Sequence, residues 1–171
     1  MERWFERKFQ LDLPLSLFPN IVERLHGVPV RLEEHLLPLP PEILTFKKEK
    51  DWSIQEHAGH LLDLESLNLG RLDDYEQGLS NLRPADLQNR KTYEANHNQR
   101  SIQNLLTEFR REREVFVGRL QNYGVEFVSR SAIHPRLQIP MRVIDLAYFI
   151  AEHDDHHLTT IATTIRRLAG F

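Results

Sequence analysis

The sequence predicts an all-α fold, a four-helix bundle, from three observations. Four segments of roughly four to seven turns carry apolar residues at helical spacing. Strand signals are weak, and only the short VEFVS stretch at residues 125–129 is expected to be extended. A stretch of about twenty residues between the second and third helices predicts one long crossover. We therefore expect a single domain over residues 1–171, in which residues 1–14 form an extended N-terminal arm without assignable chemistry.

The first helix is expected from Asn20, where apolar residues begin to recur on one helical face. Gly27 and Pro29 interrupt this pattern, so the helix is expected to be kinked or to restart there. The proline-rich stretch LPLPPEIL at residues 37–44 cannot continue a helix and ends it.

The second helix has a clear start signal. Ser53 is a favourable N-cap, and Glu56, three residues later, completes a capping box. This helix is expected to run to about Gly78. Residues 79–100 follow without a clear period, and a connection of that length is expected to be functional or partly helical.

The third and fourth helices are separated by a second loop. Ser101 is expected to cap the third helix, which Gly124 closes. The loop ends in HPRLQIP, and Pro140 is expected to start the fourth helix, which ends near Gly170.

Composition excludes several classes of function. The formal net charge of −3 comes from both signs, so we expect no nucleic-acid partner, and the arginines of RREREVFVGR (110–119) are expected to lie on a solvated helix face. The chain lacks a run of about 18 apolar residues, and its N-terminus is too charged for a signal peptide, which predicts a cytoplasmic protein without a membrane partner. Nine histidines and no cysteine make His, with Asp and Glu, the only strong ligands for a transition metal.

The histidines of the fourth helix suggest a metal site. At about 100° per residue, His153 and His157 fall within the apolar stripe one turn apart, whereas His156 falls off it. Two imidazoles so placed can reach one atom, and the second helix can supply a third ligand. On that helix His57 lies nearer the centre of the apolar face and His60 at its edge, so the pattern alone does not choose between them. Histidines hydrogen-bonded to carboxylates across the bundle are the structural alternative.

Weaker candidates lie near these histidines. Asp63 and Asp154 could each accept a ring N–H from a ligand histidine, although a solvated helix face is the favoured interpretation of both. His134, in the loop before the last helix, is expected near the mouth of the bundle or as an incidental turn residue. The HDDHH sequence at residues 153–157 lacks the HExxH glutamate of zinc proteases.

Two motifs together resemble a known family. WSIQEHAGHLLDLE (52–65), followed by HPR (134–136) and AEHDDHHLTTI (151–161), is similar to the DinB/YfiT-like superfamily, and the similarity extends from about Pro14 to Leu168. This resemblance implies an up-down-down-up four-helix bundle with a divalent metal, nickel or zinc. The metal ligands that it implies are His60, His153 and His157. His57 and His156 then become neighbours of the site.

The first functional hypothesis is a metal-dependent thiol S-transferase or hydrolase acting on a small molecule. Because the chain has no cysteine, any thiolate must come from a low-molecular-weight thiol that acts as substrate or cosubstrate. The alternative is a non-catalytic bundle whose metal or histidine cluster is structural. The resemblance also implies that the protein can form a homodimer.

Overall fold

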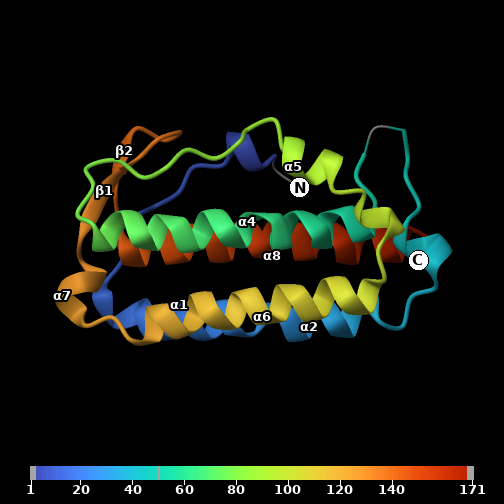
Figure 1. The fold of residues 1–171 in the computed structure, drawn as a ribbon, viewed down its shortest axis with the longest axis horizontal. Coiled ribbons are helices and arrows are strands. Elements are labelled where there is room, and N and C mark those ends of the chain that lie inside the picture. Colours follow the sequence, from blue (N-terminus) through green and yellow to red (C-terminus); the bar gives the residue numbers. More distant parts are fainter. Residues whose placement is uncertain (1–2, 50, 169–171) are drawn as a thin grey trace.

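The computed structural model describes residues 3–49 and 51–168, and its body is formed by two layers of long helices. In Figure 1, α4 and α8 lie side by side in one layer, and α6 lies with α1 and α2 in the other. The long helices are α1 (Phe18–His26), α2 (Val28–Leu36), α4 (Ile54–Glu76), α6 (Ile102–Gln121) and α8 (Val143–Leu168). The predicted all-α bundle is therefore confirmed.

The connectivity of the bundle is up-down-down-up. The α1–α2 pair and α8 run in one direction, whereas α4 and α6 run in the other (Figure 1). Because α4 and α6 are parallel neighbours, residues 77–101 must return along the whole bundle, and they cross the outer side of the α4–α8 layer. This crossover covers the middle of α4.

Local sequence signals explain most helix ends. The backbone N–H of Glu56 donates to Ser53 Oγ (3.0 Å) and Glu56 Oε2 accepts from the Ser53 N–H (2.8 Å), which confirms the capping box. Gly27 separates α1 from α2, as predicted, and Ser101 caps α6. The predicted end of the fourth helix near Gly170 lies outside the described residues.

Several short elements join the long helices. A β-hairpin between α7 and α8 was not predicted, and its first strand also pairs with the crossover, where the Leu82 N–H donates to the Ile133 carbonyl (3.0 Å). The short elements are η1 (Trp4–Glu6), η2 (Leu15–Leu17), α3 (Pro41–Leu44), α5 (Arg90–Glu94), η3 (His97–Gln99), α7 (Val125–Val128), β1 (Ser131–His134) and β2 (Ile139–Arg142). The crossover is thus partly helical, as expected.

Two local predictions near the β-hairpin were wrong. VEFVS was expected to be extended, but residues 125–128 form one helical turn. Of these four residues Val128 is the buried one, so the segment lacks the alternating burial that stabilises a strand. Pro140 does not start α8. It lies opposite Ile133 in the hairpin, where a proline is tolerated because the strand is at an edge, and α8 begins three residues later at Val143.

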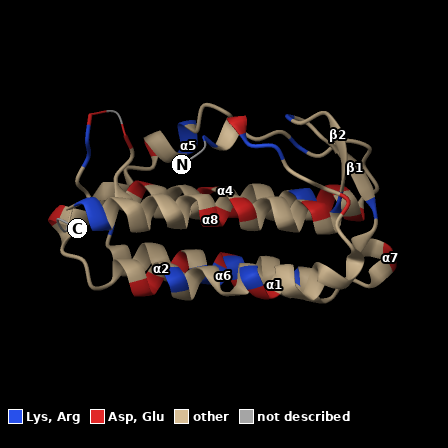
Figure 2. Ribbon diagram, turned by 180° about the vertical axis from the view of Figure 1, so that it is seen from behind, with Lys and Arg blue, Asp and Glu red and all other residues tan. Residues whose placement is uncertain are grey.

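The core of the bundle is divided by a buried ion cluster. Arg113 on α6 is 1% exposed, and its guanidinium donates to Glu65 on α4 (2.7 Å) and to Asp154 on α8 (2.5 Å). One apolar cluster includes Phe109 and the other includes Phe116, one turn to either side of Arg113. The expectation that the arginines of this stretch are solvated is therefore wrong for Arg113, although acidic and basic residues do alternate along α6 and α1 (Figure 2).

The N-terminal arm is anchored along α8. Arg7 donates to Glu152 (2.5 Å), and the backbone N–H groups of Asp12 and Leu13 donate to Asp145 (3.1 and 3.3 Å). These contacts bring Trp4 onto the middle of α8. None of the helices within residues 3–49 and 51–168 has the length and hydropathy needed to cross a bilayer.

Candidate metal centre

His60, His153 and His157 come together in the middle of the α4–α8 layer. One ring nitrogen of each lies within 4.8 Å of the others, and the Nε2 atoms of His153 and His157 are 3.2 Å apart. Zn–N bonds of about 2.0–2.1 Å in a tetrahedral site put two ligand nitrogens about 3.3 Å apart. The spacing of His153 and His157 therefore fits two ligands of one divalent cation, and His60 lies close enough to supply a third.

Hydrogen bonds between α4 and α5 determine which nitrogen of His60 is free. Thr92 Oγ1 donates to Asp63 Oδ2 (2.9 Å) and lies 3.0 Å from His60 Nδ1. A hydroxyl has one hydrogen, and an ionised carboxylate only accepts, so His60 Nδ1 must donate to Thr92. The lone pair of His60 is then on Nε2, which is the state that a metal ligand requires.

His57 plays the corresponding role for His157. The two Nδ1 atoms are 2.8 Å apart, so one of them donates to the other. If Nε2 of His157 is a ligand atom, its hydrogen is on Nδ1 and His57 accepts it. His57 then orients the ring of His157 from outside the three-histidine cluster.

Burial keeps the cluster uncharged. Burial, more than any neighbouring charge, lowers the pKa of His60 to about 4, and burial followed by the other imidazoles lowers the pKa of His153 and His157 well below 6.5. A neutral imidazole is the form that binds metal. Three neutral rings without hydrogen-bond partners for all their nitrogens are poor core material, whereas a cation accepts three lone pairs at once.

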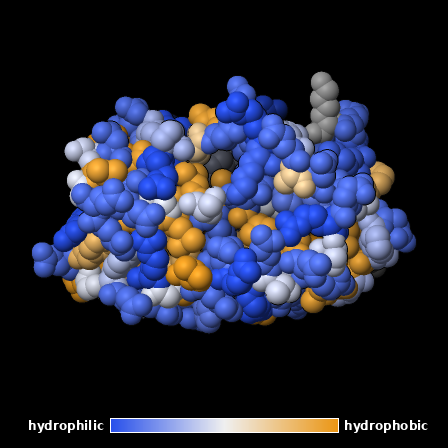
Figure 3. Space-filling model, in the orientation of Figure 1, coloured by the Kyte–Doolittle hydropathy of each residue, from blue (hydrophilic) through white to orange (hydrophobic). Residues whose placement is uncertain are grey.

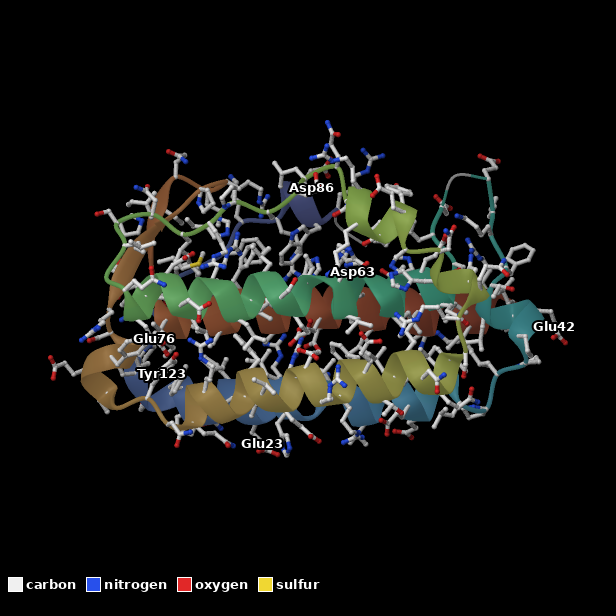
Figure 4. The ribbon with its side chains drawn as sticks, in the orientation of Figure 1. Glu23, Glu42, Asp63, Glu76, Asp86 and Tyr123 are labelled. Carbon is white, nitrogen blue, oxygen red and sulfur yellow. The ribbon has the colours of Figure 1, made fainter. Side chains whose placement is uncertain are left out.

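The crossover and α4 position Asp63. His97 Nε2 lies 2.8 Å from Asp63 Oδ2, so this carboxylate binds both His97 and Thr92 (Figure 4 shows Asp63 on the side of α4 that faces α5). Burial alone would raise the pKa of Asp63, but the bonds from these two residues lower it. The ring of His97 lies directly over Gly59, where a Cβ would be 2.3 Å from its Cγ. A glycine inside α4 is the sequence signal for this close approach.

A pocket of about 310 Å³ opens beside the histidines. Figure 3 shows a hollow on this face of the molecule, with hydrophobic side chains along part of its rim. Trp4 packs its ring edge against His153 (4.8 Å between centroids), and Trp52 packs on His60 (4.7 Å). These two tryptophans shield the cluster from solvent, so the N-terminal arm contributes to the site, although no chemistry was expected of it.

The other predicted residues are distributed around this centre. Asp154 is neither solvated nor bound to a histidine: it is 2% exposed and accepts from Arg113. Asp63 is also buried, which contradicts the solvated interpretation, and it reaches His60 only through Thr92. His134 and His156 both line the pocket. Sequence reasoning overlooked Thr92 altogether, because no periodic pattern surrounds it.

Together these features define a four-helix-bundle protein with a three-histidine cluster at the wall of a pocket. Residues 24–161 match the DinB superfamily, and the chain belongs to it. The fold is similar to that of YfiT from Bacillus subtilis, a solved structure described as a probable metal-dependent hydrolase with an unusual four-helix bundle topology. The TM-score is 0.83 at 16% identity over 96% of this chain and 94% of YfiT. A search of curated proteins for similar sequences gave no match.

Proposed function

We propose that this protein is a metal-dependent enzyme that acts on a small molecule through His60, His153 and His157. The observation that carries the proposal is the convergence of three neutral imidazoles at the wall of a pocket of about 310 Å³. A purely structural cluster has no need of an adjoining cavity. The description of YfiT as a metal-dependent hydrolase supports the same interpretation.

The proposed metal is nickel or zinc, for which three imidazoles are suitable ligands. A divalent cation held by three protein ligands keeps a coordination position open and can polarise a substrate carbonyl or activate water there. The chain itself orients the ligand rings through Thr92 and His57. The two tryptophans limit access of bulk water to the histidines, which strengthens electrostatic interactions in the pocket.

Hydrolysis is the reaction that we favour, and thiol S-transfer is the second candidate. The chain has no cysteine, so the protein contributes no thiolate of its own. Both reactions then need only an electrophilic small molecule in the pocket. They differ in whether water or an added low-molecular-weight thiol attacks it.

The experiment that tests the proposal begins with metal content. Protein purified without an affinity tag is analysed by mass spectrometry beside His60→Ala and the double variant His153→Ala/His157→Ala. We expect near-stoichiometric nickel or zinc in the parent and none in the variants. His26→Ala is the matched control, because His26 is exposed on α1, outside the pocket, with its Nδ1 3.8 Å from Glu23 Oε2.

Activity is then measured on small esters, amides and electrophiles, with and without an added thiol. Turnover that needs the metal and no thiol supports a hydrolase, and turnover that needs both supports the transferase. A metal-dependent activity that survives His60→Ala would contradict the proposed site. Metal that raises the melting temperature without supporting any turnover would favour the non-catalytic bundle.

A further inference from the structure

A second group of polar residues lines the same pocket and is not explained by the histidine cluster. It consists of Arg71 on α4, Arg136 in the hairpin loop and His134 at the end of β1. Arg71 follows His60 by eleven residues, about three turns, so both lie on one face of α4 about 16 Å apart along its axis. The pocket therefore extends from the three-histidine cluster to this second group.

His134 offers a buried donor without an acceptor. The backbone N–H of Leu137 donates to its Nδ1 (3.3 Å), so in the neutral ring the hydrogen is on Nε2. His134 is 2% exposed, and its Nε2 has no partner among the described residues. An N–H buried without a partner costs free energy, so its presence at a pocket wall indicates that a ligand completes it.

Arg136 offers a second such donor. Its Nη2 is buried without an acceptor among the described residues. The guanidinium lies near two aromatic rings, with Cζ 5.1 Å from the centre of Phe5 and 5.7 Å from that of Phe149. Such cation–π contacts favour this placement of the guanidinium and leave Nη2 available to an acceptor.

Arg71 adds a second positive charge close by. It is 4% exposed and donates its Nε–H to the carbonyl of Arg83 (3.2 Å), and within residues 3–49 and 51–168 it has no ion pair. Burial, together with the neighbouring charge of Arg136, lowers the pKa of Arg71 to about 10, so it is still charged at neutral pH. Burial, followed by these two arginines, lowers the pKa of His134 to about 3.

The carboxylates that line the pocket are bound elsewhere. Asp154 is bound to Arg113, and Asp86, which lies on the crossover (Figure 4), accepts from the backbone N–H groups of Gln88 and Arg90. Arg71, which is buried, and Arg136, which is half-buried, thus form no ion pair within the described residues. Uncompensated buried charge is costly, and a bound anion removes that cost.

We propose that Arg71, Arg136 and His134 form an oxyanion site that holds an acidic group of the substrate, a carboxylate or a phosphate. The fork of a guanidinium matches two oxygens of either group, and the imidazole N–H reaches a further lone pair. This inference rests on the proposed function, because it takes the pocket as the substrate site. It specifies an anionic small molecule whose reactive bond is directed towards the three histidines.

The test is ligand-dependent stabilisation of the full-length chain. Thermal unfolding is followed during titration with inorganic phosphate or with succinate, at constant ionic strength, for both metal-free and zinc-loaded protein. A bound anion raises the melting temperature saturably. We expect Arg136→Met to weaken the binding about 10- to 100-fold. Arg130→Met, which removes the same charge from an exposed residue beside Phe127, should have no effect.

The outcomes separate the two proposals. Saturation by phosphate alone or by succinate alone supports the site and identifies the acidic group, and saturation by both supports a general oxyanion site. No saturation by either anion, or equal saturation in Arg136→Met, overturns the inference. If Arg136→Met does not fold, Arg136→Lys keeps the charge without the fork and is expected to bind more weakly than the parent. Anion binding by a protein that takes up no metal would contradict the proposed function alone.

Discussion

Replacing Thr92 by valine tests the hydrogen-bond relay that prepares His60. The substitution keeps the shape of a side chain that is 4% exposed, and it removes the hydroxyl that lies 3.0 Å from His60 Nδ1 and 2.9 Å from Asp63 Oδ2. Without the hydroxyl, the Nδ1–H of His60 is buried without a partner, at a cost of about 1–3 kcal/mol. The ring then favours the tautomer with hydrogen on Nε2, in which the nitrogen on the side of the cluster has no lone pair for a metal.

The expected result is a loss of zinc affinity of about 10- to 100-fold, the range found for partners of metal-bound histidines. In free energy this is about 1.4–2.7 kcal/mol. The assay is competition between the protein and a chromophoric chelator, with His60→Ala as the reference for a lost ligand. Thr92→Ser keeps the hydroxyl and should bind within a few-fold of the parent.

One combination of results would exclude the hydrogen-bond relay. If Thr92→Val binds zinc as tightly as the parent while His60→Ala does not bind, the relay has no influence on the ligand. Far-ultraviolet circular dichroism of each variant must match the parent, so that an altered fold does not explain a weaker affinity.

Three further predictions concern stability and are measured by urea unfolding. Gly59→Ala should destabilise the metal-free protein by about 1–3 kcal/mol, because the new Cβ collides with the ring of His97. Gly118→Ala is the control: a Cβ there meets open space, so the substitution should be neutral or stabilising. Equal effects of the two substitutions would contradict the collision with His97. Arg113→Met leaves two buried carboxylates unpaired and should cost about 3–5 kcal/mol, and a loss below about 1 kcal/mol would show that solvent reaches them. The pKa of His134 is lowered to about 3, so between about pH 6.5 and pH 3 the unfolded chain binds a proton at this residue and the folded chain does not. The free energy of unfolding should therefore fall as the pH decreases through this range, by at most about 1.4 kcal/mol per pH unit from this group. His134→Gln should make this decline shallower, and an unchanged slope would contradict the assignment.

Much of the bundle follows from local patterns. Helix spacing and the caps at Ser53 and Ser101 predicted α4 and α6 to within a few residues, because amphipathic helices of this length have a strong period. The hairpin was missed because its strands have four residues each and the second contains Pro140. Its pairing with the crossover is a tertiary contact that no local propensity shows.

The site was predictable only where it lies on helices. His153 and His157 share a face of α8, so the sequence places their rings together, but the choice between His57 and His60 depended on family resemblance. Thr92 could not be found, because the crossover that carries it has no period. Arg113 could have been recognised as buried.

The signal for Arg113 is its position on α6. It lies four residues after Phe109 and three before Phe116, which places it on the apolar face of the helix. The surrounding run of charged residues obscured this. The position of each arginine on the helical wheel of α6, taken residue by residue, distinguishes the buried Arg113 from the solvated arginines.

The order of the helices also has a consequence for synthesis of the chain. The first helix packs against the last, and Arg24 and Arg31 bind Asp155 across 131 and 124 residues of sequence. Contacts of such long range form late, because the entropy of closing the loop is lost before they contribute. A nascent chain that has released α4 but not α8 therefore holds His60 without its partners. If the proposed site binds metal, we expect capture to follow synthesis of α8, so that a product truncated before α8 should not hold the ion.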